Sequence, residues 1–149
     1  MSTFATKGSA SNNSSSSNFG SSSSSQKTSA KKNQMKFTGC TSFRQRITSS
    51  LLSGKSLKID KIRGDDENPG LHDFEASFLH LVNELTDGTS IEINEIGTAL
   101  KFRPGVLMGG TDIEHDCGTM RSIGWFIEGL IPLAIFCKSR VEIKFTGVT

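Results

Sequence analysis

Tyrosine is absent from this 149-residue sequence, and only one tryptophan and three prolines are present. Without a series of exposed aromatic side chains, a nucleic-acid site built from stacked bases is disfavoured. The cysteines Cys40, Cys117 and Cys137 are odd in number and widely separated, which excludes a complete disulfide framework and favours a reducing compartment. The strongest apolar run, residues 131–137, is far shorter than the ~20 residues of a membrane span, so we expect no membrane partner.

Residues 1–34 lack acidic side chains and contain 13 serines and four lysines. Their few apolar side chains cannot offset the entropy lost on ordering, so we expect a disordered, serine-rich tail that is a candidate for phosphorylation. The tail has no continuous apolar core, no arginine and no amphipathic pattern, which argues against a secretory signal and a mitochondrial presequence. The remaining 115 residues carry 13 basic and 15 acidic side chains, a net charge of −2. Any RNA site must therefore be a local patch on one domain.

Apolar periodicity predicts alternating strands and helices along residues 34–149. Strand patterns cover residues 34–38, 57–60, 90–96, 100–102 and 141–145, and helical patterns cover residues 42–52, 71–85 and 116–131. In the third helix we expect Met120, Ile123, Ile127 and Ile131 to form the apolar stripe, with Asp116 as the N-cap. The order β-α-β-α-β-β-α-β predicts an α+β fold with helices on one face of a mixed four-stranded sheet.

Three ordered blocks resemble one family. They are IDKIRGDDENPGLHDFEASF at residues 59–78, FRPG through the Gly109-Gly110 pair at residues 102–110, and EHDC running to RSIG at residues 114–124. Together they are similar to the RNA 3'-terminal phosphate cyclase superfamily, and most similar to its cyclase-like branch, which is associated with ribosomal RNA processing. The resemblance covers residues 35–149. Three blocks in the same order are specific, although one alone would be weak.

The resemblance implies a repeated two-helix, four-stranded unit of order βαβαββ, like the C-terminal domain of a bacterial translation initiation factor. One repeat is complete, and a second starts near Glu114 and includes one helix and one strand. Family members continue for at least as much again, so we expect a fragment or a truncated product. The strand ending at Phe145 would then leave a sheet edge and an apolar helix face without partners, which predicts poor solubility.

The cyclase glycine loop is altered in this sequence. Cyclases have an acidic residue, a glycine run, a glutamine and then an arginine at the helix start, and Arg44 matches that arginine by position. Here Phe37 replaces the acid, residues 38–41 include one glycine, and Thr41 replaces the glutamine. Side chains in such a loop obstruct the approach of phosphate to backbone amides, so we expect no nucleotide cofactor. Cyclases also use a C-terminal nucleophilic histidine, and no histidine follows His115 in this sequence.

Five arginines are the candidate RNA-binding residues. Arg44 and Arg46 lie in the first predicted helix, where contacts to an RNA backbone and simple solvent-exposed charges both remain open. Arg63, Arg103 and Arg121 each border a loop and could share one face. The predicted site is therefore a set of guanidinium groups facing phosphates.

The remaining polar clusters favour structural roles. Consecutive acids at residues 65–67 are typical of a solvated turn or a helix N-terminus, and His72 and His80 are about 12 Å apart along a helix, too far to share a metal. His115 is expected to precede the third helix. The loop at residues 103–110 is expected to be the exit from a β-hairpin. Trp125 and Phe126 are expected in the core. We therefore expect no catalytic residue and no metal site.

The resemblance to the cyclase-like branch implies a non-catalytic assembly factor of small ribosomal subunit biogenesis, and the altered glycine loop supports this reading. The resemblance implies early pre-rRNA processing for 18S rRNA maturation in a nucleolar snoRNP particle of the nucleus. The expected partners are pre-rRNA, snoRNP components and a nucleolar GTPase. Two enzymatic alternatives stay open: an ATP-dependent RNA 3'-terminal phosphate cyclase and a pre-rRNA endonuclease. The residues provide no base, metal site or nucleophile for the endonuclease.

Overall fold

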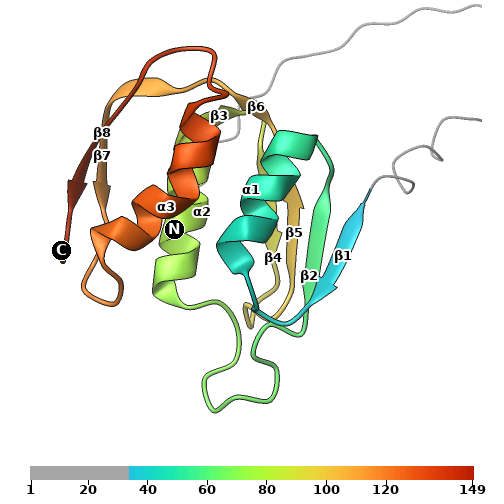
Figure 1. Ribbon diagram of the computed structural model, residues 1–149. Helices are drawn as coiled ribbons and strands as arrows, with labels where there is room; N and C mark the ends of the chain where they lie inside the picture. Colours follow the sequence, from blue (N-terminus) through green and yellow to red (C-terminus); the bar gives the residue numbers. More distant parts are fainter. Residues whose placement is uncertain (1–33) are drawn as a thin grey trace, which may run out of the picture.

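The computed structural model describes residues 34–149, so the predicted tail lies outside the described residues except for Gln34. Its first unit is a four-stranded sheet with strand order β1-β2-β5-β4, covered on one face by helices (Figure 1). The elements of this unit are β1 (Met35–Thr38), α1 (Phe43–Ser53), β2 (Leu57–Asp60), α2 (Asp73–Glu84), β4 (Ser90–Ile93) and β5 (Leu100–Arg103). Strand β1 runs parallel to β2, and β5 is antiparallel to both of its neighbours. The predicted α+β class and the βαβαββ unit are confirmed.

The sheet has one buried and one exposed face, as its alternating sequence requires. In β2, Leu57 and Ile59 are fully buried against the helices, whereas Lys58 and Asp60 face solvent and form an ion pair at 2.8 Å. Alternation of this kind positions one face of each strand on the core. The helices supply the other side of the core with side chains that are each less than 10% exposed. They include Phe43, Ile47, Phe74, Phe78, Leu81, Val82, Phe126 and Leu133.

A second β-α-β unit follows, with the same order as β1-α1-β2. It consists of β7 (Gly110–Asp116), α3 (Ile123–Ala134) and β8 (Val141–Thr146), and its two strands are parallel. The expected beginning of a second repeat is therefore present. A short antiparallel pair, β3 (Thr86–Asp87) with β6 (Val106–Leu107), joins the two units and was not predicted. Two-residue strands are too short to show a periodicity.

Helix α3 packs across α1 and α2 at a glycine. A Cβ atom on Gly129 would lie 2.8 Å from ring atoms of Phe78, and the hydroxyl of Thr48 donates to the Gly129 carbonyl at 3.3 Å. The missing side chain therefore allows close approach of the helices. This packing brings the start of α3 beside the start of α1, and the candidate site is lined by residues from both.

The prediction for the third helix was wrong at its N-terminus. Helix α3 begins at Ile123 with Ser122 as its N-cap, whereas Asp116 ends strand β7. The predicted stripe was also wrong: Met120, Ile127 and Ile131 are exposed, and the buried positions are Phe126, Gly129, Leu130 and Leu133. Helix α3 is apolar on most sides, so periodicity alone does not identify its core face. In the described part of the chain, no helix is long and apolar enough to cross a membrane.

Candidate functional site

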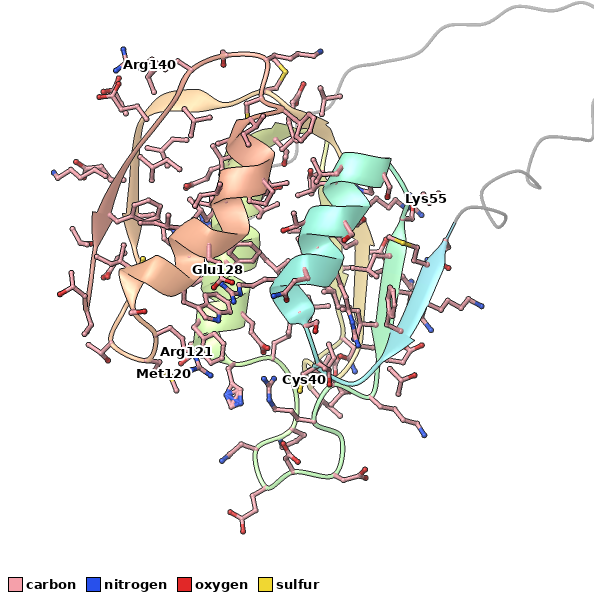
Figure 2. All side chains as sticks on the ribbon, in the orientation of Figure 1. Cys40, Lys55, Met120, Arg121, Glu128 and Arg140 are labelled. Atoms are coloured by element: carbon pink, nitrogen blue, oxygen red, sulfur yellow. The ribbon has the colours of Figure 1, made fainter. Side chains whose placement is uncertain are left out.

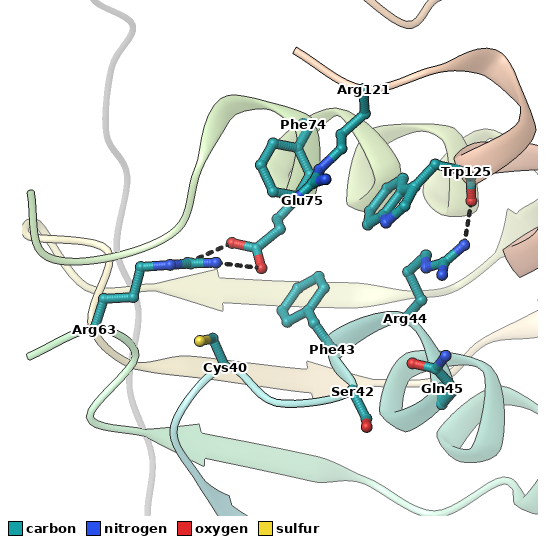
Figure 3. Close-up of a pocket in the computed structure, with 10 residues that line it drawn as sticks. All are labelled: Cys40, Ser42, Phe43, Arg44, Gln45, Arg63, Phe74, Glu75, Arg121 and Trp125. Carbon is teal, nitrogen blue, oxygen red and sulfur yellow. Dashed lines mark hydrogen bonds and ion pairs between the residues drawn. The ribbon is translucent and has the colours of Figure 1, made fainter.

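A polar hollow of about 350 Å³ opens where β1 and β2 end and α1 begins (Figure 3). Its walls come from the loop after β1, the first turn of α1, the loop after β2, the first turn of α2 and the start of α3. The lining residues are Cys40, Ser42, Phe43, Arg44, Gln45, Arg63, Phe74, Glu75, Arg121 and Trp125. Three guanidinium groups against one carboxylate give this lining a net charge of +2. We call this hollow the arginine pocket.

Arg63 and Glu75 form the fixed side of the arginine pocket. The guanidinium donates two hydrogen bonds to the Glu75 carboxylate, at 2.7 and 2.9 Å, and a third to the Gly70 carbonyl at 3.0 Å. Hydrogen bonding to Glu75 raises the pKa of Arg63, and burial opposes this effect without cancelling it. Glu75 also accepts from the backbone amide of His72 and so completes a capping box at the start of α2. The pair therefore ties the loop after β2 to the helix.

Arg44 forms the opposite wall, at the start of α1. Its guanidinium lies 4.5 Å from the Trp125 ring centroid, donates to the Trp125 carbonyl, and pairs with Glu128 at 3.0 Å. Only 13% of its side chain is exposed. The interpretation of Arg44 as a simple solvent-exposed charge is therefore wrong, because the residue joins α1 to α3.

Of the three arginines in the pocket, Arg121 makes the fewest interactions with other described residues. It precedes α3 and lies over the Phe74 ring, 4.7 Å from its centroid. Within residues 34–149, no carboxylate forms an ion pair with it. Stacking on an aromatic face leaves the edge of a guanidinium free to donate hydrogen bonds. Arg121 is therefore the group that is best able to bind an incoming anion.

The first turn of α1 adds backbone donors to the same hollow. Ser42, at the N-cap, has a left-handed backbone (φ 54°) and forms no side-chain cap, and the first turn includes no acidic residue. The amides of residues 43–45 lie at the positive end of the helix dipole. Together with the arginines, this end of α1 favours phosphate or carboxylate groups.

Two of the five predicted arginines lie outside the arginine pocket. Arg46 is not one of its lining residues; it donates to the Gly39 carbonyl at 2.7 Å and stacks over Phe37. Arg103 is exposed at the end of β5, and the pairing of Leu57 with Phe102 places it at the opposite end of the sheet from Arg63. The expectation that Arg63, Arg103 and Arg121 share one face is wrong for Arg103. The structure instead brings Arg44, Arg63 and Arg121 together.

The predicted acids and histidines show no metal-binding cluster. Across the described residues, no group of three His, Cys, Asp or Glu side chains could hold a metal ion. The acids at residues 65–67 are exposed in the loop before α2. His72 is the N-cap of α2, and His80 is exposed and pairs with Glu84 at 3.4 Å.

His115 is buried on β7, where the sequence predicted the beginning of a helix. Its Nε2 lies 3.0 Å from the hydroxyl of Ser77 on α2, and desolvation lowers its pKa. Phe126 and Phe145 pack against the ring. The contact joins the second unit to α2. Sequence reasoning also missed Glu75, because its capping box uses a histidine in place of the usual serine or threonine.

Comparison with known proteins identifies a family. The family model described as "RNA 3'-terminal phosphate cyclase" matches residues 35–149. The chain is 52% identical over 115 residues to "Probable RNA 3'-terminal phosphate cyclase-like protein" of Dictyostelium discoideum, and 47% identical over 121 residues to "RNA 3'-terminal phosphate cyclase-like protein" of Homo sapiens. It is 45% identical over 113 residues to "rRNA processing protein RCL1" of Saccharomyces cerevisiae.

The matched segments are the larger part of this chain and a smaller part of its relatives. They cover 77%, 81% and 76% of the chain, and 31%, 32% and 30% of the three relatives in the same order. The chain therefore spans about a third of the length of the curated relatives that it matches.

Proposed function

Because the chain belongs to the RNA 3'-terminal phosphate cyclase family, and its relatives are cyclase-like proteins, we propose that it contributes to ribosomal RNA processing without catalysing a reaction. In its finer form, the proposal is an assembly role in early small-subunit biogenesis and 18S rRNA maturation. It places the protein in a nucleolar snoRNP particle of the nucleus, with pre-rRNA and a GTPase as partners. The name of the Saccharomyces cerevisiae relative supports the processing role.

The arginine pocket carries the proposal. Arg44, Arg63 and Arg121 converge on one hollow with the N-terminal amides of α1 (Figure 3). A guanidinium matches two oxygens of a phosphate, and each phosphate contact adds sequence-independent affinity. The described residues around the hollow thus fit an RNA backbone, although the chain as a whole carries only a small net charge.

The groups that line the hollow support binding more than catalysis. Both oxygens of Glu75 already accept hydrogen bonds from Arg63, so this carboxylate is poorly placed to take a proton from a substrate. Cys40 and Ser42 are the nucleophilic side chains of the lining, and neither is hydrogen-bonded to a histidine or a carboxylate in the described part of the chain. A nucleophile needs such a base for activation.

Binding of a fluorescent single-stranded RNA to the full chain tests the proposal. Arg121→Gln removes the pocket arginine that makes the fewest interactions with other described residues. Arg103→Gln is the matched control at the far end of the sheet. We expect R121Q to weaken binding and to reduce the slope of log K against log salt by about 1, the effect of one lost phosphate contact. R103Q should bind like the wild type. Equal losses in both variants, or no binding at all, would contradict the proposed site.

Covalent labelling by ATP distinguishes the cyclase alternative from the proposed non-catalytic role. A cyclase becomes adenylylated when it is incubated with ATP, so radiolabel from the α-phosphate should remain on the denatured chain. We expect no label on this chain and no cyclisation of an RNA 3'-phosphate. Retained label would replace the assembly role with the cyclase alternative.

Association of the protein with a particle that contains precursor ribosomal RNA is tested in cells. The chromosomal copy is tagged, a nuclear extract is sedimented, and the fractions are probed for precursor ribosomal RNA. Co-sedimentation of the tagged protein with large RNA particles is expected. A tagged species that stays small and free of RNA would contradict the assembly role.

A further inference from the structure

The arginine pocket adjoins a group of exposed acids in the loop after β2. Asp65, Asp66 and Glu67 follow Arg63 closely in this loop, and the backbone amide of Asp66 donates to the Arg63 carbonyl at 3.3 Å. Within residues 34–149, none of the three acids forms an ion pair. Cations and unpaired acids therefore lie side by side at this end of the molecule.

This mixture of charges matches an RNA backbone only in part. RNA carries a phosphate at every nucleotide and no cation of its own. The arginines attract such a chain, whereas the neighbouring acids repel it over a distance at which charges still interact. A ligand that carries an anionic group close to basic side chains would satisfy both surfaces.

A segment of this same chain acquires that pattern when a serine is phosphorylated. Residues 21–32 read SSSSSQKTSAKK, in which a run of serines is followed by Lys27, Lys31 and Lys32 without any acid. Unmodified, the segment is purely basic, so the pocket arginines repel it. A phosphoserine carries a charge of about −1.5 to −2 at pH 7 and provides strong acceptor oxygens. A protein kinase would transfer the γ-phosphoryl group of ATP to the serine hydroxyl, which loses its proton, and ADP would leave.

We propose that a phosphoserine within residues 21–25 occupies the arginine pocket of its own chain. Its phosphate accepts hydrogen bonds from Arg121 and from the backbone amides at the start of α1, which are charge-assisted contacts. The lysines that follow the phosphoserine lie beside the acids of residues 65–67. Competition with RNA for the pocket rests on the proposed function, and phosphorylation then acts as a switch that lowers RNA affinity.

The chain is long enough to make this contact. The amide of Met35 donates to the Ser56 carbonyl at 2.8 Å, so β1 begins beside Lys55. Figure 2 shows Lys55 and the pocket residue Cys40 at opposite ends of the first unit. The four residues of β1 cover roughly 13 Å of this path. Ser25 precedes Met35 by ten residues, which reach up to about 33–36 Å when extended.

Attachment to the same chain also favours occupancy. A ligand tethered by a short segment has an effective concentration on the order of 1 mM at its site. A phosphoserine that would bind only weakly as a separate peptide can therefore fill the pocket for much of the time. RNA in solution has to exceed this local concentration to displace it.

The rate at which a phosphatase removes the phosphate measures occupancy without RNA. The full chain is made with a genetically encoded phosphoserine at Ser23, alone and combined with Arg121→Gln. We expect release from the first chain to be slower by at least about threefold, which corresponds to a pocket filled about two-thirds of the time. The ratio should not change with protein concentration, because the contact forms within one chain. Arg103→Gln, at the far end of the sheet, should leave the protection intact.

Asp66→Asn separates the two ligands of the pocket. Without this charge the lysines lose a partner, so docking of the phosphorylated segment should weaken by about 1.5- to 5-fold, the range of an exposed ion pair. RNA binding to the unmodified chain should instead become stronger, because a repelling charge has been removed. Asp87→Asn is the control, since Asp87 is an exposed acid of β3, outside the loop after β2.

The results distinguish this inference from the proposed RNA role. Equal release from the chains with and without R121Q, or protection that rises with protein concentration, would overturn the inference even if the unmodified chain binds RNA. A D66N variant that changes docking and RNA binding in the same direction would also overturn it. Protection that is lost in R121Q, in a chain that binds no RNA, would support the docked phosphoserine and contradict the RNA role.

Discussion

Arg63 and Glu75 join the loop after β2 to the start of α2 through two hydrogen bonds of 2.7 and 2.9 Å. The pair is shielded from water, since the two side chains are 14% and 3% exposed. It organises one side of the arginine pocket and also satisfies the backbone amide of His72. The same carboxylate therefore fixes the start of α2 and holds Arg63 at the edge of the proposed anion site.

Glu75→Gln should lower the free energy of unfolding by about 1.5–3 kcal/mol, the contribution of a hydrogen bond to a charged group. The variant keeps the shape of the side chain but leaves Arg63 without a buried counter-charge. Urea unfolding at neutral pH measures the loss. Glu92→Gln is the control, because its pair with Lys101 is exposed on the outer face of the sheet and should change the unfolding midpoint far less.

The burial of His115 predicts a pH dependence of stability. Desolvation lowers its pKa in the folded state below the ordinary value of about 6.5. Between these two values the unfolded chain binds more protons, so stability should fall as the pH drops below about 6.5 and should be fully present above it. Urea unfolding at pH 7.5 and pH 5.5 measures this slope. His115→Asn should reduce the difference between the two conditions, and an unchanged slope would contradict the assignment.

Gly129→Ala should destabilise the fold by about 1–3 kcal/mol, because the added Cβ would lie 2.8 Å from the Phe78 ring. Gly124→Ala in the same helix is the matched control. Its nearest neighbour would be the Ser122 hydroxyl at 3.8 Å, so the change should be neutral or stabilising by less than about 1 kcal/mol. Thermal melts of the two variants give the comparison. Similar losses for both would show that helix packing at Gly129 tolerates a methyl group.

Arg44→Gln should shift the fluorescence emission maximum of Trp125, the single tryptophan. The guanidinium covers the Trp125 ring at 4.5 Å, and its removal admits water to that face. We expect a shift of the emission maximum to longer wavelength and a stability loss of about 1 kcal/mol. Arg46→Gln is the control, since Arg46 stacks on Phe37 and should leave the emission unchanged.

The sequence predicted the first unit well, because its elements are long and their patterns are regular. The alternation of residues 57–60 identified β2, and the stripe from Leu71 to Leu85 identified α2 within two residues of its observed bounds. The third helix was harder to predict because an apolar face continues around most of it. Its N-terminus was extended through a turn and the end of β7.

The arginine pocket was predicted in part. Arg44, Arg63 and Arg121 were recognised as candidates, but their convergence depends on how α3 crosses α1. Arg121 was placed inside a helix, whereas it precedes α3 and so reaches over Phe74. Arg103 was included because it borders a loop. Only the strand register shows that it lies at the far end of the sheet.

The strand order β1-β2-β5-β4 also has a consequence for biosynthesis. Ile59 pairs with Leu100, so β2 gains its second neighbour only after 41 further residues have been made. Until then, the backbone N–H and C=O groups on this edge of β2 have no strand to pair with on the nascent polypeptide. Closing so long a loop is slow relative to forming the local helices. The growing chain is therefore most exposed to chaperones and to misassembly in the interval before β5 leaves the ribosome.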